Sequence, residues 1–339
     1  NIKLQKTTRR RFMKVLVRAP FSEKGLSELR NMYDEVIYEP WNKTGEWFED
    51  DKTSELLQRV KPDIFITELD RVGKKSLSSW QGLKLLGVCR ANPANGDVDR
   101  CTQEGLPIIC TPARNAQAVA ECAVGMTICY MRHIAEAACW ERNGMWGQKN
   151  GVSPYYLFQG NELSGKKIGF VGFGAVGRAA AGLFKAFGTN NVFYDPYVEQ
   201  AEDVRKVSLE ELFSTCDIIS IHLPVNDATK KMIGSELIAL MKPTAIFLNT
   251  ARSAVVDMEA LYNAIKEKKI GGAVMDVMEN EPPTKEEIEK WKLDNVLLTP
   301  HICGASYEVS DHHSDIMVER IKKWENGEQK NCIIFNKVQ

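Results

Sequence analysis

One segment near the middle of the chain, KIGFVGFGAVGRAAAGLFKAF, restricts the possible folds more than any other. An apolar run suited to a buried strand leads directly into Gly172, Gly174 and Gly177, and a helical run of small and apolar residues follows. A strand, a GxGxxG turn and a helix in this order are typical of the βαβ unit that binds dinucleotide phosphates. The three glycines serve the tight turn, the close approach of the backbone to a pyrophosphate, and the packing of helix on strand. The segment therefore predicts a parallel α/β domain whose helix N-terminus faces a nucleotide, although glycines can also pack without one.

Short apolar strands and helical runs alternate through most of the 339 residues, which is too long a chain for one comfortable core. This alternation predicts parallel sheets and an α/β fold. The strands expected in the first third are 14–18, 35–38, 63–67, 83–88 and 107–110. A second series begins at Lys167, with strands expected at 168–171, 192–194, 218–222, 245–248, 273–276 and 296–298. One long helix is expected over 116–143, and a last helix over 305–325.

Charge and cysteine usage narrow the class of protein. The chain has 44 basic and 45 acidic residues, so nucleic acid is not expected as a partner. Its nine cysteines are odd in number and form no CxxC pair, which indicates reduced thiols, a cytoplasmic location and no metal site. Residues 118–131, the longest apolar stretch, are too short to span a membrane, so no membrane association is expected. The polar residues 1–12 are interpreted as a leader or a frayed end.

An acidic residue follows the strand after the glycine motif. Asp195, in NVFYDP, ends that strand, where a carboxylate can accept hydrogen bonds from the adenine ribose hydroxyls. Glu199 is nearby, and no basic residue follows before Arg205. A 2′-phosphate would be repelled, so the sequence favours NAD over NADP.

Three charged residues come just after strands of the second series. Arg252 lies in LNTARSAVVD, Glu281 in DVMENEPP and His301 in TPHICGAS. Each alone is ordinarily a surface ion pair, a loop charge or a satisfied loop histidine. The carboxyl ends of parallel strands meet at one edge of a sheet, however, and ligands bind at that edge.

Taken together, these segments resemble the D-isomer-specific 2-hydroxyacid dehydrogenases. The resemblance runs from Met13 onward and rests on VGFGAVGR with YDP, HLPVNDAT, LNTARSAVVD, DVMENEP and TPHICGAS, in this order. It implies an NAD-dependent oxidoreductase that moves a hydride between NAD(H) and a small 2-oxo or 2-hydroxy acid. His301 would be the general acid and base, Glu281 would orient its imidazole, and Arg252 would bind the substrate carboxylate.

The resemblance also implies which residues contact the cofactor and the substrate. The implied cofactor contacts are Gly172, Gly174, Ala175, Val176, Gly177, Asp195, Pro196, Leu223, Pro224, Thr229, Thr250, Ala251, Asp276 and Gly304. The implied substrate contacts are Asn92, Pro93, Ala94, Asn95 and Asn115. Many family members have GVGxDNID where this chain has NPANGDVD, and Pro93 removes one backbone donor. Asn92 or Asn95 is expected to compensate, unless these residues are simple turn formers.

The fold implied by the resemblance has two Rossmann-like domains with an active-site cleft between them. A flavodoxin-like substrate domain would comprise residues 1–111 and 305–339, and an NAD-binding Rossmann domain residues 112–304. The apolar tail 332–335 would return to the first domain as a covering strand. Residues 116–143 and the extended segment after them resemble the family's dimer arm, which predicts a homodimer through the NAD-binding domains.

The choice of substrate is left open by the sequence. Phosphoglycerate-specific relatives carry a basic residue after the strand matching 64–67, whereas this chain has Glu68, and Arg71 would have to turn inward to replace it. No regulatory domain is expected after the last helix. Glyoxylate, hydroxypyruvate or a sugar-derived acid is therefore favoured over 3-phosphoglycerate. An NAD-sensing corepressor remains an alternative, whereas formate dehydrogenases carry glutamine where Glu281 stands.

Overall fold

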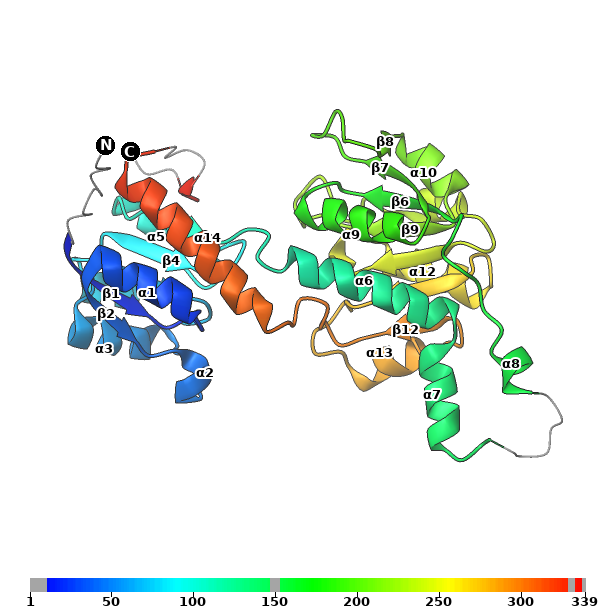
Figure 1. The fold of residues 1–339 in the computed structure, drawn as a ribbon, viewed down its shortest axis with the longest axis horizontal. Helices are drawn as coiled ribbons and strands as arrows, with labels where there is room; N and C mark the ends of the chain where they lie inside the picture. Colours follow the sequence, from blue (N-terminus) through cyan, green and yellow to red (C-terminus); the bar gives the residue numbers. More distant parts are fainter. Residues whose placement is uncertain (1–10, 147–152, 329–332, 337–339) are drawn as a thin grey trace, which may run out of the picture. The chain divides into compact units, whose positions relative to one another are not determined.

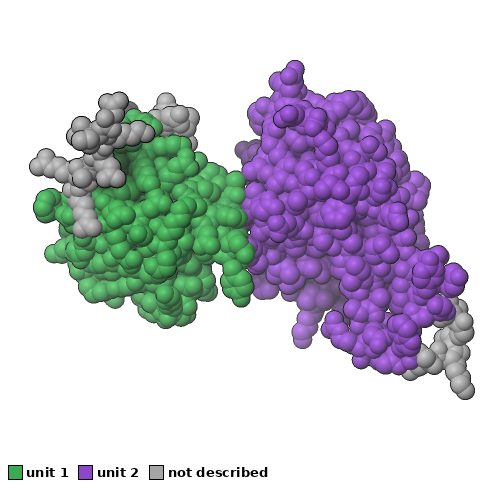
Figure 2. All heavy atoms as spheres, in the orientation of Figure 1, with its two compact units in different colours: residues 1–114, 307–339 green, residues 115–306 purple. Residues whose placement is uncertain are grey.

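The chain forms two compact units in a computed structural model that describes residues 11–146, 153–328 and 333–336. Unit 1 comprises residues 1–114 and 307–339, and unit 2 comprises residues 115–306 (Figure 2). Unit 1 is therefore built from both ends of the chain, and unit 2 is continuous.

Unit 1 is a five-stranded parallel sheet with helices on both faces (Figure 1). The strand order, β2-β1-β3-β4-β5, is the flavodoxin-like order that the sequence predicted. The strands are β1 (Arg11–Val17), β2 (Tyr33–Tyr38), β3 (Ile64–Thr67), β4 (Leu85–Val88) and β5 (Ile108–Cys110). The helices are α1 (Glu23–Met32), α2 (Trp41–Thr44), α3 (Asp50–Val60), α4 (Lys74–Ser79), α5 (Val98–Gln103) and α14 (Glu308–Glu325).

The core of unit 1 follows from the alternation of side chains along β1. Val15 and Val17 point to one face of the sheet, where they join the core formed with α1 and α14. Leu16 points to the other face and packs with residues of α3. α14 thus covers β1, and Figure 1 shows α14 beside α1.

Both ends of unit 1 differ in part from what the sequence predicted. Arg11 and Phe12 belong to β1, so the expected frayed end does not extend to residue 12; residues 1–10 lie outside the described residues. The tail does return to the sheet, but by an isolated antiparallel bridge between Ile334 and Ile109. The N–H of Phe335 donates to the Ile108 carbonyl at 2.7 Å, and Cys332 lies outside the described residues.

Unit 2 is a seven-stranded parallel sheet in the order β12-β11-β10-β9-β6-β7-β8. This is the Rossmann order, with its reversal between β6 and β9. The strands are β6 (Lys167–Val171), β7 (Asn190–Tyr194), β8 (Arg205–Lys206), β9 (Ile218–Ile221), β10 (Ile246–Asn249), β11 (Gly272–Met275) and β12 (Val296–Leu298). The longer helices are α6 (Ala116–Met131), α7 (Ile134–Arg142), α9 (Ala175–Ala186), α10 (Leu209–Thr215) and α12 (Met258–Lys266), and the short ones are α8 (Pro154–Leu157), α11 (Ser235–Ala239), η1 (Ser253–Val255) and α13 (Lys285–Lys290).

The prediction of a single helix over residues 116–143 was wrong. The segment forms two helices, because His133 adopts a left-handed conformation with φ of 54° and ends the regular hydrogen bonding after α6. The last helix likewise begins at Glu308 rather than at residue 305. None of the helices in the described residues is long and apolar enough to cross a membrane.

Candidate active site

Residues 172–177 form the turn between β6 and α9, called here the glycine turn. Gly172 has a φ of 91°, which L side chains rarely adopt, and a Cβ on Gly177 would lie 2.4 Å from the Gly172 carbonyl oxygen. A Cβ on Gly174 would meet nothing within 4 Å, so the backbone there is open to approach. The turn lies where the strand order reverses and at the N-terminus of a twelve-residue helix. These residues fit the pyrophosphate of a dinucleotide.

Asp195, just after β7, is fixed beside the glycine turn. One of its carboxylate oxygens accepts the N–H of Phe173 at 2.7 Å, and the other accepts the N–H of Tyr197 at 2.8 Å. The basic side chains that follow are already paired, Lys206 with Glu199 and Arg205 with Glu211. The negative charge of Asp195 is therefore held in place without a neighbouring free cation among these residues.

A histidine supports the glycine turn from the next strand. The ring of His222 stacks on Phe170, its Nε2 lies 2.8 Å from Ser220 Oγ, and its carbonyl faces Gly172. Burial lowers the pKa of His222 to about 4, so the ring is neutral at physiological pH. The imidazole that packs behind the glycine turn is therefore uncharged.

His301 and Glu281 are in direct contact. The Nδ1 atom of His301 lies 2.7 Å from Glu281 Oε2, and both side chains are partly exposed, at 38% and 40%. The other oxygen of Glu281 accepts the N–H of Met278 at 3.3 Å, and the Met278 carbonyl accepts the hydroxyl of Ser253 at 2.7 Å. The loops after β10, β11 and β12 are thereby tied together, and His301 Nε2 is the ring nitrogen that does not face Glu281.

Arg252 lies in the same group of loops. Its side chain is exposed, and Nη1 donates to the Ala251 carbonyl at 2.6 Å. The loop is held by Asn249, a fully buried residue at the end of β10. Its amide oxygen accepts the N–H of Ala251 at 2.9 Å, and its amide nitrogen donates to the Arg252 carbonyl at 3.1 Å. Sequence reasoning missed Asn249, although an asparagine at the end of an otherwise apolar strand was a signal.

Asp276 holds the turn that carries His301. Residues 299–303 form this turn, called here the His301 turn. Asp276 is buried and accepts hydrogen bonds from the Thr299 hydroxyl at 2.6 Å and from the N–H groups of Ile302 at 2.9 Å and Cys303 at 2.8 Å. His301 itself has a φ of 54°, a conformation that such anchoring helps to maintain. The predicted contact of Asp276 with a cofactor stays a prediction.

The remaining predicted cofactor residues also lie in unit 2. Thr250 is buried, and its hydroxyl has no partner, which leaves it available to a ligand. Thr229 donates through its hydroxyl to the Pro224 carbonyl at 2.6 Å and so shapes the loop after β9. Gly304 lies against Asn115, because a Cβ there would be 2.6 Å from Asn115 Nδ2. Ala175 and Val176 belong to α9, Pro196 follows Asp195, and Leu223 and Ala251 follow β9 and β10.

The predicted substrate residues fall in both units. Asn92, Pro93, Ala94 and Asn95 lie in the loop after β4 of unit 1, whereas Asn115 precedes α6 of unit 2. Pro93 is buried, and Asn92 is exposed. Asn95 donates through Nδ2 to the Asp70 carbonyl at 2.8 Å, and its buried Oδ1 has no partner. Of the two asparagines, Asn92 is therefore the better candidate to replace the backbone N–H donor that Pro93 lacks.

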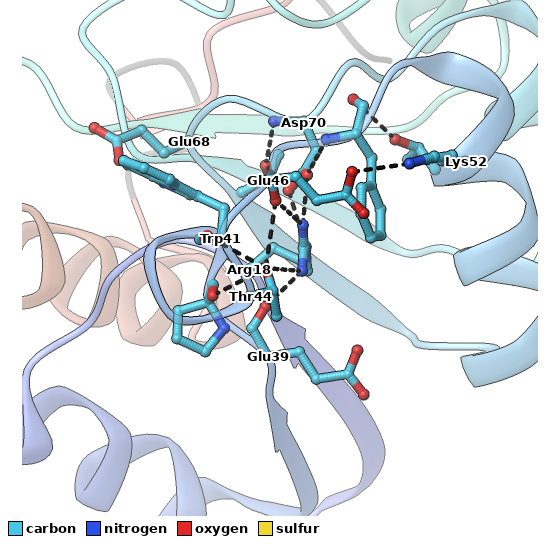
Figure 3. Close-up of polar contacts among 12 residues, drawn as sticks. Arg18, Glu39, Trp41, Thr44, Glu46, Lys52, Glu68 and Asp70 are labelled. Carbon is cyan, nitrogen blue, oxygen red and sulfur yellow. Dashed lines mark hydrogen bonds and ion pairs between the residues drawn. The ribbon is translucent and has the colours of Figure 1, made fainter.

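A polar cluster that sequence reasoning missed surrounds Glu68 at the end of β3. Trp41 Nε1 donates to one carboxylate oxygen of Glu68 at 3.1 Å (Figure 3). Arg114 Nη1 donates to the other at 2.5 Å. Arg71, which would have had to turn inward, is exposed. The carboxyl end of the unit 1 sheet thus presents a fixed carboxylate.

The loop that carries Trp41 is held by a buried ion pair. Arg18 and Asp70 are 1% and 0% exposed, and their charged groups lie 3.1 Å apart. Arg18 also donates to the Glu39 carbonyl at 2.9 Å and to the Glu46 carbonyl at 2.9 Å (Figure 3). These contacts span the loop on both sides of α2, so the position of Trp41 depends on Arg18.

Comparison with known proteins agrees with the site. A sequence model of the D-isomer specific 2-hydroxyacid dehydrogenase NAD-binding domain matches residues 124–303, more than half of the chain. The chain belongs to this family. It is an oxidoreductase that acts on the CH–OH group of 2-hydroxy acids with a nicotinamide dinucleotide.

Relatives and a solved structure extend the similarity to nearly the whole chain. The chain is 41% identical over 338 residues to YoaD of Bacillus subtilis (strain 168), a protein named as a 2-hydroxyacid dehydrogenase, with 98% of each chain covered. It is 35% identical to a glyoxylate reductase of Thermococcus litoralis, covering 80% of this chain and 84% of that one. The crystal structure of the TT0316 protein from Thermus thermophilus matches with a TM-score of 0.76 at 27% identity, covering 95% of this chain and all of that one. The predicted fold of two Rossmann-like units is thereby confirmed.

Proposed function

We propose that this enzyme transfers a hydride reversibly between NAD(H) and a small unphosphorylated 2-oxo acid, giving the D-2-hydroxy acid. Glyoxylate, hydroxypyruvate and sugar-derived 2-oxo acids are the favoured substrates. The observation that carries the proposal is the 2.7 Å contact between His301 and Glu281, beside the loop of Arg252. This arrangement can supply a proton, orient its donor and bind a carboxylate.

His301 acts on the carbonyl oxygen of the substrate. Its Nδ1 is held by Glu281, so Nε2 donates the proton during reduction and accepts it during oxidation. Glu281 keeps the ring oriented through the contact between its Oε2 atom and Nδ1 of His301. Arg252 binds the substrate carboxylate through its planar set of donors. When bound, the nicotinamide supplies or accepts the hydride.

The cofactor is held by unit 2. The glycine turn and the N-terminus of α9 take the pyrophosphate, Asp195 accepts the ribose hydroxyls, and Thr250 offers its unpartnered hydroxyl. Asp195 is fixed by two backbone donors and repels a 2′-phosphate, which supports NAD over NADP. We expect kcat/KM to be at least about tenfold higher with NADH than with NADPH, which corresponds to a difference of roughly 1.4 kcal/mol in activation free energy. Asp195→Ala should lower the ratio of kcat/KM with NADH to kcat/KM with NADPH.

The reaction is tested by following NADH oxidation with glyoxylate, hydroxypyruvate, pyruvate, phosphohydroxypyruvate and several sugar-derived 2-oxo acids. His301→Ala should lower kcat by about 100- to 10,000-fold, because it removes the general acid. His312→Ala, an exposed histidine of α14, is the control and should keep full activity. If every acid fails while NADH still binds, the proposed reaction with these acids is refuted and a role in NAD sensing becomes the leading proposal.

We also propose that the protein is a homodimer through its NAD-binding units and works in the cytoplasm. Large hydrophobic side chains are exposed on and beside α7 and α8, among them Trp146, Tyr155 and Tyr156. Such a patch favours association with a second copy. The eight free cysteines of the described residues support a reducing compartment. A monomeric mass by light scattering at micromolar concentration would contradict the dimer.

A further inference from the structure

Three sulfur atoms meet beside the His301 turn, although they come from distant parts of the sequence. The Sγ of Cys303 lies 3.4 Å from the Sδ of Met126 on α6, and the Thr299 hydroxyl lies 3.5 Å from the same sulfur. Cys122 is one helical turn before Met126, so the two residues share a face of α6. Cys122 packs against the buried core cluster that contains Cys303, and the two thiols interact through a side-chain hydrogen bond. Cys303, two residues after His301, therefore lies against the thiol of Cys122 on α6.

The two thiols differ in reactivity. The hydrogen bond between them lowers the pKa of Cys122 and raises the pKa of Cys303. Burial and the neighbouring Asp276 carboxylate raise the pKa of Cys303 further. Cys122 is partly exposed, whereas Cys303 is 3% exposed. Cys122 is thus the thiol that an oxidant in solution reaches first, with Cys303 held against it.

We propose that Cys122 and Cys303 form a peroxide-sensitive modification site that closes to a reversible disulfide and slows the enzyme. The thiolate of Cys122 attacks one oxygen of a peroxide, the O–O bond breaks, and a sulfenic acid and hydroxide form. The sulfur of Cys303 then attacks the sulfenic sulfur, its proton passes to the departing hydroxyl, and water leaves. Each sulfur loses one electron, and the peroxide takes up both.

The disulfide acts on the enzyme through the His301 turn. An S–S bond of about 2.05 Å is much shorter than a contact between two thiols, so closing it draws Cys303 toward α6. The N–H groups of Ile302 and Cys303 are bound to Asp276, so the turn has to rearrange. His301 then loses its alignment with Glu281. Only this last effect rests on the proposed function.

The other cysteines show why this pair stands apart. Burial raises the pKa of Cys101 and Cys110 to about 12 and that of Cys216 to about 11, so these thiols are inert to peroxide. Cys139, on α7, is exposed. It therefore serves as an internal control for an exposed thiol outside the His301 turn.

The experiment treats the full-length enzyme with hydrogen peroxide, blocks the remaining thiols, and maps the peptides by mass spectrometry without reduction. We expect a peptide linking Cys122 to Cys303, lighter than the two free peptides by two hydrogen atoms and released by dithiothreitol. Cys122→Ser should keep the basal activity and be inactivated at least tenfold more slowly than the wild type. Cys139→Ser should behave as the wild type.

Three results would overturn the proposal: Cys122 oxidised beyond the sulfenic acid without a link to Cys303, equal oxidation of Cys122 and Cys139, or a link that leaves turnover unchanged. Cys303→Ala gives a second check, since Cys122 should then accumulate as a sulfenic acid that a dimedone probe traps. The mass readout is independent of turnover. An enzyme inactive on every acid would refute the proposed function and still report whether the disulfide forms.

Discussion

Glu281 uses one carboxylate oxygen for His301 and the other for a backbone N–H of its own loop. A glutamine at this position keeps the size of the side chain and loses its charge. We predict that Glu281→Gln lowers kcat by about 10- to 100-fold, because a hydrogen bond to a charged partner contributes about 1.5–3 kcal/mol. Steady-state kinetics with NADH and the best acid test this prediction. An unchanged KM for NADH is the expected control, and an unchanged kcat would remove Glu281 from the mechanism.

Glu68 places a negative charge at the carboxyl end of the unit 1 sheet. In Glu68→Gln, the Arg114 guanidinium loses its carboxylate partner and becomes available to an anion. We predict that the ratio of kcat/KM for phosphohydroxypyruvate to that for hydroxypyruvate rises about tenfold, which corresponds to roughly 1.4 kcal/mol. Glu55→Gln, on α3, is the surface control. A constant ratio would show that Glu68 does not select against phosphate.

Sequence reasoning found the residues whose chemistry is recognisable and missed those whose role depends on the fold. His301, Glu281 and Arg252 were chosen because an acid, its partner and a carboxylate binder follow strands that end at one edge. Arg18 and Trp41 were missed, because their partners, Asp70 and Glu68, are distant in sequence. The anchoring of the His301 turn by Asp276 was missed for the same reason.

At the scale of single elements, α9 gives the sharpest test of the cofactor site. A Cβ at Gly177 would collide with the Gly172 carbonyl, whereas a Cβ at Gly182 on the same helix would meet nothing within 4 Å. We predict that Gly177→Ala weakens NADH binding more than tenfold, measured by fluorescence titration, because the helix must move away from the glycine turn. Gly182→Ala should keep the affinity and stabilise the helix by about 0.5–1 kcal/mol. Equal affinity in both variants would count against the glycine turn as the phosphate site.

The sequence predicted the strands well and the helix boundaries less well. The strands are continuous apolar runs because helices cover both faces of each parallel sheet, so burial alone marks them. The break between α6 and α7 was not predictable in this way. The residues before and after the break both favour a helix, and the break depends on the backbone conformation of one residue, His133. Short helices such as α5 were missed because six residues hold too little periodicity to recognise.

At the scale of the whole molecule, the two units have separate cores, and their stabilities can be changed separately. We predict that NADH at a hundredfold excess over its Kd stabilises unit 2 by about 2.7 kcal/mol and leaves the unfolding of unit 1 unchanged. Differential scanning calorimetry should then show one transition that moves and one that does not.

The converse prediction concerns the stability of unit 1. Arg18→Met leaves Asp70 buried without its cation, and we predict a loss of about 3–5 kcal/mol from the stability of unit 1 alone. Calorimetry with and without NADH measures both effects in one series. A single transition that responds to both changes would show that the units unfold together.

The first strand of the chain is covered by its last helix, and this has a consequence for biosynthesis. Met317, Val318 and Ile321 of α14 complete the core around β1, so unit 1 lacks part of its interior until α14 has left the ribosome. Unit 2 is continuous and has all of its residues by Ser306. During translation, unit 2 can therefore finish folding first, while the core between β1 and α1 of unit 1 still lacks the side chains of α14.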